Sequence, residues 1–292
     1  MMIRPNAREP DMSSPAPSHA DTCWQALLQA RDHDWSTGPL RVPLDPGRLT
    51  IQADGRWQAE PSLNSPDAEL LDALLPVLCA PEGCVIGQLG QSLDGRIATA
   101  SGHSHYINVL EARVHLHRLR ALVDAVVVGA GTVAADDPAL TVRHVEGPNP
   151  LRVVIDPRGR LAGHHRLFTD GQAPTRQLIG TTLPTDACGA HQRHAVLPEA
   201  EGSGLPGAVI AHLRDAGYRR ILIEGGSTTL SHFLEAGALD RLHLLVAPLL
   251  IGSGKTGLSL TPIETLESAR RPPCRRFSLG DDTLFDLDLG TT

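Results

Sequence analysis

The sequence predicts an α/β protein whose mostly parallel central sheet is covered by helices on both faces. Short, continuous apolar runs, as found in strands buried on both faces of a parallel sheet, recur along the chain. Longer segments with apolar residues at helical spacing alternate with them, which is typical of such sheets. Polar clusters follow several runs, where the carboxyl ends of parallel strands bind ligands. The runs lie at 85–89, 124–128, 151–155 and 221–223, the helical segments at 108–122 and 205–216, and the polar clusters at 92–94, 129–137 and 224–228.

The composition of the 292 residues favours a protein with a substantial core and no nucleic-acid partner. A hydrophobic content of 41% supports the core, and aliphatic side chains must fill it because aromatic residues make up only 3%. The formal net charge of −7 argues against nucleic acid. No apolar run approaches the roughly 18–20 residues of a membrane helix. Five scattered cysteines indicate a reducing compartment, and residues 1–21 contain no apolar signal region, so we expect a cytoplasmic protein without membrane contact.

The first 80 residues are predicted to form two parts without assignable chemistry. Residues 1–21 are rich in proline, serine and charge, which predicts a disordered tail. Residues 22–80 predict a small accessory module with a packing or partner-binding role. Its expected elements are a helix from Thr22, a hairpin over 49–60 that turns at Asp54-Gly55, and a helix that Ser65-Pro66-Asp67 opens.

Residues 81–292 are predicted to form the main domain. The segment 129–143 is expected to be a loop with at most two helical turns, because Pro138 ends any helix there. The strand over 242–251 contains Pro248, which predicts an edge strand or a bulge. Further expected features are a turn at 156–159, short strands near 177–179 and 195–197, a last antiparallel strand over 283–289, and core-facing residues Leu110, Val114 and Leu119 in one helix and Val209, Leu213 and Ala216 in another.

The stretch 220–230 is the strongest candidate for a ligand site. A buried strand over 221–223 ends at Glu224 and runs into Gly225-Gly226, after which a helix begins. Glycines allow a tight turn and a close ligand approach, and Ser227 or Thr228 is placed to cap the helix. The free N–H groups of a helix start suit an anion. An ordinary strand-to-helix turn with a glycine for packing remains the alternative.

Three other motifs are weak or fail on a specific residue. The G-x-G-x-x-A pattern at 129–134 resembles a dinucleotide fingerprint, but Pro138 breaks the helix that it requires. The stretch 252–256 resembles a phosphate-binding loop but has Leu249 where a glycine is needed. A zinc deaminase site would need a cysteine where Phe277 stands. Paired histidines lack cysteine or carboxylate partners, so we expect no metal site.

Taken together, the motifs resemble a known family from about residue 85 to residue 289. They are SLDGRIA at 92–98, SGHS at 101–104, LRA at 119–121, DA at 124–125, GAGTV at 129–133, DDPALTVR at 136–143, NPLRVVID at 149–156, EGG at 224–226 and APLLIG at 247–252. The set is similar to the reductase domain of bifunctional riboflavin-biosynthesis deaminase-reductases and to stand-alone pyrimidine reductases. The resemblance implies a dihydrofolate-reductase-like fold, a three-layer α/β/α arrangement with antiparallel C-terminal strands, NADPH as cofactor, and a homodimer. The reaction that it implies is reduction of a ribosylamino-pyrimidinone 5′-phosphate to the ribitylamino product.

The resemblance also implies roles for individual residues. Asp94 and Glu224 are the acidic candidates for catalysis, able to bind sugar hydroxyls or relay a proton. Arginine is the residue type that binds phosphate groups best, which agrees with the substrate roles of Arg120 and Arg143. The implied cofactor contacts are Gly90, Tyr106, Thr132, Asp136, Gly226, Ser227, Thr228 and Thr229, and the implied substrate contacts are Ser104, Arg120, Leu140, Arg143 and Glu224.

Several positions depart from the pattern of the family. Gln88 stands where lysine is usual, Asn108 where threonine is common, and Tyr106 where tryptophan is usual. The N-terminal module takes the place of the deaminase and lacks its zinc motif. Two alternatives therefore stand beside the riboflavin-pathway reductase: the same fold and cofactor acting on another pyrimidine or a pterin, and a non-catalytic binding or scaffold protein.

Overall fold

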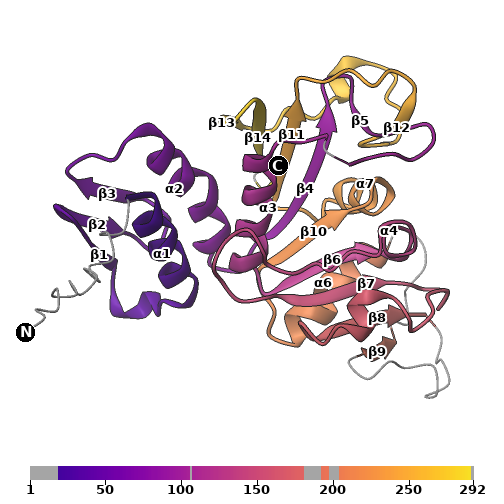
Figure 1. The fold of residues 1–292 in the computed structure, drawn as a ribbon, viewed down its shortest axis with the longest axis horizontal. Coiled ribbons are helices and arrows are strands. Elements are labelled where there is room, and N and C mark those ends of the chain that lie inside the picture. Colours follow the sequence, from indigo (N-terminus) through magenta and orange to yellow (C-terminus); the bar gives the residue numbers. More distant parts are fainter. Residues whose placement is uncertain (1–18, 106, 181–191, 197–203, 291–292) are drawn as a thin grey trace, which may run out of the picture.

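The computed structural model of the protein describes residues 19–105, 107–180, 192–196 and 204–290. The disorder expected for residues 1–21 therefore falls almost entirely outside the described residues. Figure 1 shows a small N-terminal module beside a larger α/β domain. No helix in the described part of the chain is long and apolar enough to cross a membrane.

The described part of the larger domain is built on a nine-stranded sheet of order β13-β14-β11-β4-β10-β6-β7-β8-β9. All neighbours from β11 to β9 pair in parallel, whereas β14 is antiparallel to both β11 and β13. The mostly parallel sheet with antiparallel C-terminal strands is therefore confirmed. The strands are β4 (Val85–Ser92), β6 (Ala125–Gly129), β7 (Leu151–Ile155), β8 (Thr175–Ile179), β9 (Gln192–Val196), β10 (Ile221–Gly225), β11 (Arg241–Ala247), β13 (Cys274–Leu279) and β14 (Asp282–Asp288).

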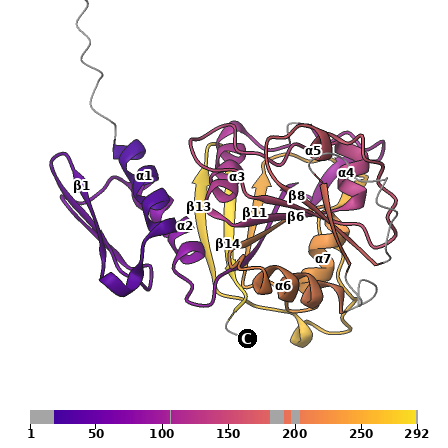
Figure 2. The same ribbon diagram turned by 90° about the horizontal axis from the view of Figure 1, so that it is seen from below.

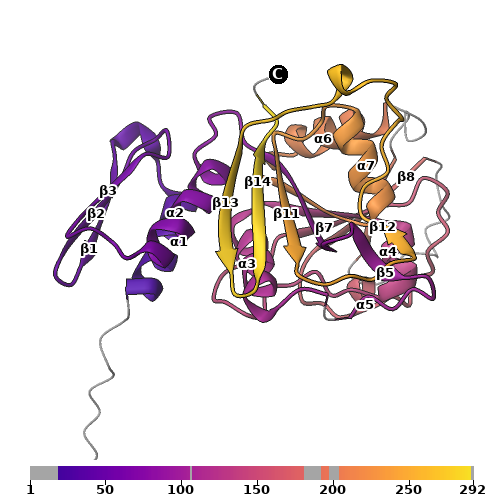
Figure 3. The same cartoon turned by 90° about the horizontal axis from the view of Figure 1, so that it is seen from above.

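Helices cover both faces of this sheet, so the three-layer arrangement is also confirmed (Figures 2 and 3). On one face lie α3 (Leu110–Leu122), α4 (Ala130–Asp136) and α5 (Arg166–Thr169), and on the other lie α6 (Leu205–Asp215) and α7 (Ser227–Glu235). Because successive strand side chains point to opposite faces, Ile86 and Leu222 join one core cluster, and Val85 and Ile221 join the other. The short strands β5 (Arg96–Thr99) and β12 (Gly254–Thr256) pair beyond the end of β4.

Three details differ from the sequence prediction. β11 is an interior strand between β4 and β14, and it ends at Ala247, so Pro248 follows the strand rather than marking an edge or a bulge. Leu110 is 51% exposed although helical spacing placed it in the core, because it occupies the first turn of α3 at the domain surface. Ala216 is exposed because α6 ends before it.

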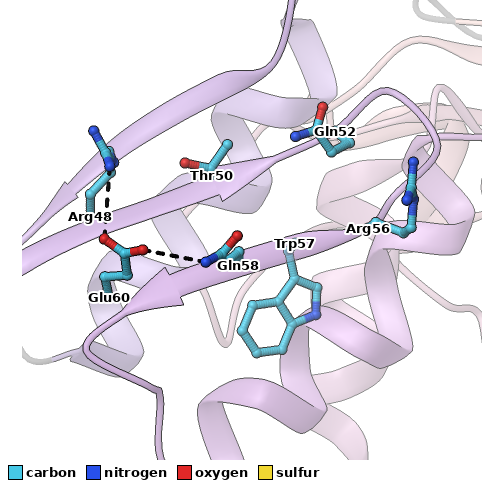
Figure 4. Close-up of a pocket in the computed structure, with 7 residues that line it drawn as sticks. All are labelled: Arg48, Thr50, Gln52, Arg56, Trp57, Gln58 and Glu60. Atoms are coloured by element: carbon cyan, nitrogen blue, oxygen red, sulfur yellow. Dashed lines mark hydrogen bonds and ion pairs between the residues drawn. The ribbon is translucent and has the colours of Figure 1, made fainter.

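The N-terminal module packs two helices on one face of a three-stranded antiparallel sheet. Leu49 and Ile51 point to the helices and are fully buried. The opposite face is polar: Figure 4 shows Arg48, Thr50 and Gln58 along a shallow recess of about 510 Å³. The predicted hairpin and both predicted helices are confirmed. The elements are α1 (His19–Asp32), a 3-10 turn η1 (Trp35–Thr37), β1 (Leu40–Leu44), β2 (Gly47–Ile51), β3 (Trp57–Glu60) and α2 (Ser65–Leu78).

Polar contacts and a shared core attach this module to the larger domain. Trp24 Nε1 donates to the backbone oxygen of Glu146 over 3.1 Å, and Arg220 Nη1 donates to that of Arg31 over 2.7 Å. Buried side chains of α1 and α2 form one hydrophobic cluster with those of α3. The division of the chain at residue 80 stays a prediction, because the core is continuous across it.

Candidate functional site

A cleft of about 350 Å³ lies at the carboxyl ends of the parallel strands, where the sequence predicted a ligand site. The ends of β4, β6 and β10 form its floor, and α3 and α4 flank it. Seven of the predicted site residues line the cleft: Gly90, Ser104, Thr132, Asp136, Leu140, Glu224 and Gly226. Tyr106, a predicted cofactor contact, lies outside the described residues.

Arg120 of α3 holds Glu224 at the end of β10. Arg120 Nε donates to Glu224 Oε2 over 2.8 Å, and Arg120 Nη2 donates to Oε1. The third nitrogen, Nη1, donates to the backbone oxygen of Thr141 over 3.0 Å. The two charged side chains are only 6% and 12% exposed. The bidentate pair therefore fixes the orientation of the Glu224 carboxylate at the cleft.

The turn between β10 and α7 consists of two glycines. Gly225 has a φ of +111°, which a residue with a Cβ rarely adopts. The N–H of Gly226 donates to Thr132 Oγ1 over 2.7 Å and so joins this turn to the start of α4. α7 begins without a side-chain cap, so the expected cap by Ser227 or Thr228 is wrong. An uncapped helix start leaves first-turn N–H groups for an anion.

Two further glycines allow close packing around the cleft. A Cβ at Gly129, the last residue of β6, would collide with Thr229 Oγ1 of α7. A Cβ at Gly90 in β4 would collide with Asn108 Oδ1. Asn108 Nδ2 in turn donates to Asp282 Oδ2 over 2.9 Å, which fixes the amide against β14. These close contacts bring the end of β6 against the first turn of α7, and they bring β4 and the start of β14 against Asn108, which lies just before α3.

Several cationic side chains lie near one another beside the cleft. Arg143 Nη1 donates to Thr141 Oγ1 over 3.0 Å, and its backbone N–H donates to His117 Nδ1 over 2.9 Å. Partial removal from water, together with the positive charges of Arg120 and Arg166, lowers the pKa of Arg143, although its side chain remains exposed at the surface. Burial and the positive charges of Arg120 and Arg143 lower the pKa of His117 to about 3, so this ring is neutral and accepts. A bound anion would relieve the repulsion among these arginines.

Asp94 lies outside the lining of the cleft. One carboxylate oxygen accepts from Ser92 Oγ and the other from the backbone N–H of Gly252 over 2.6 Å. These bonds, and a further one from the N–H of Ile251, lower the pKa of Asp94 to about 2. The carboxylate therefore tethers the loop that follows β11 to the end of β4.

Sequence reasoning missed two arginines of this region. Arg113 lines the cleft. It stands seven residues, about two helical turns, before Arg120, and this spacing could have placed both on one side of α3. Arg166 is close enough to affect the pKa of Arg143, but it comes from a segment that the sequence predicted only as loops and short strands.

The helix starts at and beside the cleft have features that fit a dinucleotide. A Cβ at Gly131 in the first turn of α4 would meet nothing within 4 Å, so the space beside this turn is open. The uncapped start of α7 lies next to this turn, because the N–H of Gly226 donates to Thr132 Oγ1. Glycine turns beside helix starts are the backbone arrangement that holds pyrophosphate groups.

Known proteins are similar to this chain in sequence and in fold. A 2,5-diamino-6-ribosylamino-4(3H)-pyrimidinone 5′-phosphate reductase of Methanothermobacter thermautotrophicus is 32% identical over 209 residues, which cover 69% of this chain and 96% of that protein. The riboflavin biosynthesis protein RibD of Mycobacterium tuberculosis is 36% identical over 184 residues, 62% of this chain but only 46% of that protein.

A solved structure is also similar to this chain in its fold. The diaminohydroxyphosphoribosylaminopyrimidine deaminase/5-amino-6-(5-phosphoribosylamino)uracil reductase of Thermotoga maritima superposes with a TM-score of 0.62 at 25% identity. The superposition covers 76% of this chain and 61% of that one. The family model described as the RibD C-terminal domain matches residues 84–275. The chain therefore belongs to the RibD C-terminal domain family.

Proposed function

We propose that the protein is an NADPH-dependent reductase that converts a ribosylamino-pyrimidinone 5′-phosphate into its ribitylamino form. The arrangement of the cleft carries the proposal. The carboxylate of Glu224 is fixed by Arg120 and directly precedes the glycine turn that leads into α7, and a group of arginines lies beside the cleft. Related proteins are named as reductases of such a phosphate. The phosphates of a nicotinamide dinucleotide and of a phosphorylated sugar both need anion-binding positions, and the start of α7 and the arginines beside the cleft are the two candidates.

The cofactor would lie along the turns that follow β6 and β10. The first-turn N–H groups of α7 would receive its phosphate groups, and Asp136 at the end of α4 would accept from a ribose hydroxyl. The bound nicotinamide supplies a hydride, and the protein positions the two reactants. The residues that we assign to the cofactor are Gly90, Tyr106, Thr132, Asp136, Gly226, Ser227, Thr228 and Thr229.

The substrate would lie between α3 and the loop after α4. Arg143 is exposed and cationic, so we assign it to the substrate phosphate, with Ser104 and Leu140 along the sugar and ring. Glu224 would accept from hydroxyl or amino groups of the substrate. All three nitrogens of Arg120 already donate to protein oxygens, so we assign it to positioning Glu224. Asp94 would act through the loop that it tethers.

One observation favours a second substrate class. Gln88 lines the cleft and is only 6% exposed, and a neutral amide there offers no charge to a phosphate. The same fold and cofactor acting on another pyrimidine or on a pterin is therefore our second candidate.

We also propose a cytoplasmic homodimer. Cys23, Cys79 and Cys84 are buried free thiols, which suits a reducing compartment. Leu250 and Leu266, on the segment between β11 and β13, are 72% and 76% exposed, and such apolar side chains favour association. Light scattering during gel filtration measures the mass directly.

The proposed function is tested by adding NADPH or NADH to the purified protein and following the nucleotide absorbance after adding each candidate substrate. Oxidation of NADPH that depends on the ribosylamino-pyrimidinone phosphate is the expected result. Oxidation with a dihydropterin or another pyrimidine alone would favour the second candidate. Failure of either nucleotide to bind would contradict both and favour a non-catalytic scaffold.

A further inference from the structure

The loop between α4 and β7 contributes Leu140 to the cleft in a backbone conformation that leucine seldom adopts. Leu140 has a φ of +54°, in the left-handed region. The Cβ of an L-residue makes this region unfavourable by roughly a factor of 5 to 30. The side chain is nevertheless only 1% exposed, belongs to a core cluster and lines the cleft. Tertiary contacts, rather than local preference, must therefore hold Leu140 in place.

Two buried arginines bind the backbone oxygens on either side of Leu140. Arg152 Nη1 donates to the oxygen of Ala139 over 3.2 Å, and Arg120 Nη1 donates to that of Thr141 over 3.0 Å. We call these two bonds the carbonyl clamp. Both arginines are at most 5% exposed. Rotation of Leu140 to an ordinary conformation would turn at least one of the two carbonyls away from its arginine, so the carbonyl clamp opposes that rotation.

Arg152 is itself anchored on the far side of the loop. It lies in the middle of β7 and is completely buried. Its Nη1 also donates to Asp170 Oδ2 over 3.0 Å, and its Nη2 donates to the backbone oxygen of Ala173 over 2.6 Å. The planar guanidinium thus spans two loops, one after α4 and one before β8, in a geometry that a single ammonium group does not reproduce.

Stability alone does not account for this arginine. Arg152 Nε has no hydrogen-bond partner among the described residues, and a buried N–H without a partner is costly. A buried ion pair such as that of Arg152 and Asp170 is often no more stabilising than apolar side chains of similar volume. What the arginine provides and an apolar residue would not is a fixed position for the Ala139 carbonyl.

We propose that Arg152 is a positioning residue of the cleft, which keeps Leu140 in the left-handed conformation so that the cleft wall is formed before the substrate binds. This inference rests on the proposed reductase function. The clamped segment also carries Thr141 Oγ1, which accepts from Arg143, the residue assigned to the substrate phosphate. Without the carbonyl clamp, Leu140 would spend most of its time in ordinary conformations, and the apparent substrate affinity would fall with the population of the competent one.

The test removes both charges of the ion pair together, in Arg152→Met/Asp170→Asn, so that no unpaired charge stays buried. We expect KM for the ribosylamino-pyrimidinone 5′-phosphate to rise by roughly 5- to 30-fold, the population that the left-handed conformation would lose. The Kd for NADPH should stay unchanged, because its assigned contacts lie outside this loop. Hydrogen exchange at the backbone N–H groups of residues 139–141 should become faster.

A second background separates positioning from general destabilisation. Glycine adopts the left-handed region about as readily as the right-handed one. In a Leu140→Gly background, the same double replacement should therefore change KM by no more than about twofold. Val153→Ala is the matched control, because Val153 is the next residue of β7, is fully buried and points to the opposite core cluster. It should lower stability and leave both KM and the exchange of residues 139–141 unchanged.

If the double variant fails to fold, Arg152→Lys replaces it, because it keeps a positive charge opposite Asp170 and loses the two-armed guanidinium. It should raise KM and speed the exchange in the same direction. Unchanged exchange, faster exchange with an unchanged KM, or an equal rise of KM in the Leu140→Gly background would each overturn the proposal. A wild type that oxidises NADPH with no substrate would contradict the proposed function alone, since the exchange rates still decide whether Arg152 holds the loop.

Discussion

Arg120 of α3 and Glu224 of β10 are 104 positions apart in the sequence, and two hydrogen bonds join their side chains. Both side chains are nearly buried, so neither charge is solvated well by water. The pair therefore sets the direction of the Glu224 carboxylate and ties α3 to β10. Stability and activity should both depend on it, but in separable ways.

Breaking this pair on one side should be costly. Glu224→Leu or Arg120→Leu alone leaves a buried, uncompensated charge, and we expect a loss of about 3–5 kcal/mol in the free energy of unfolding. The double replacement Arg120→Leu/Glu224→Leu should recover much of this loss, while kcat/KM stays at least roughly 100-fold below the wild type. Denaturant unfolding and steady-state kinetics measure the two quantities. A double variant that regains activity would show that the pair is only structural.

Arg143→Ala should weaken binding of the phosphorylated substrate. A charge-assisted bond to phosphate is worth about 1.5–3 kcal/mol, so KM should rise by roughly 10- to 100-fold while kcat changes little. The exposed Arg158 offers a matched control, since Arg158→Ala removes the same charge from a turn outside the cleft. The competition between substrate and inorganic phosphate should also weaken in Arg143→Ala. An unchanged KM would place the phosphate elsewhere.

Two neighbouring glycines should respond differently to alanine. Gly129→Ala drives a Cβ into Thr229 Oγ1, and overpacking of this kind costs about 1–3 kcal/mol. Gly131→Ala meets nothing within 4 Å inside α4, so the protein should be stabilised by about 0.5–1 kcal/mol.

The Gly131→Ala variant also tests the assignment of the cofactor to the first turn of α4. If NADPH packs against the first turn of α4, Gly131→Ala should raise the Kd for NADPH despite its gain in stability. Thermal unfolding and a fluorescence titration separate the two effects. Unchanged NADPH affinity in Gly131→Ala would move the cofactor away from this turn.

Asp94 should keep the loop that follows β11 tethered even at strongly acidic pH. Its folded-state pKa is about 2, below the usual value of about 3.9. The stabilisation of the loop is therefore complete above about pH 4 and is lost only as the pH falls through about 2. Hydrogen exchange at the N–H of Gly252, corrected for intrinsic rates, should show constant protection from pH 8 to 4. Asp94→Asn should reduce this protection at every pH, and a loss between pH 6 and 4 in the wild type would contradict the tether.

The buried strands of this fold could be predicted because both of their faces are covered. β6, β7 and β10 read as continuous apolar runs, and the structure buries nearly all of their residues. β13 was missed because four of its six residues are exposed and polar or charged side chains dominate it. β1 was missed because Pro43 interrupts its alternation. Strands on a surface carry too weak a pattern to stand out.

The candidate site could be predicted in its residue types but not in its pairing. Glu224 and Arg120 were both singled out, yet sequence spacing gives no sign that one binds the other across the fold. Ser227 or Thr228 was predicted to cap α7, whereas the capping position is Gly226, which has no side chain to cap the helix. Tertiary contacts, here between Gly226 and Thr132, replace the local bond that the sequence favoured.

The most direct test of the reductase proposal is a single turnover with NADPH deuterated at the transferred position and the ribosylamino-pyrimidinone 5′-phosphate. We expect the deuterium in the sugar chain of a ribitylamino product, formed by the wild type and not by Glu224→Leu. NADPH that binds but transfers no deuterium to this substrate would contradict the proposal and direct the search to another heterocycle.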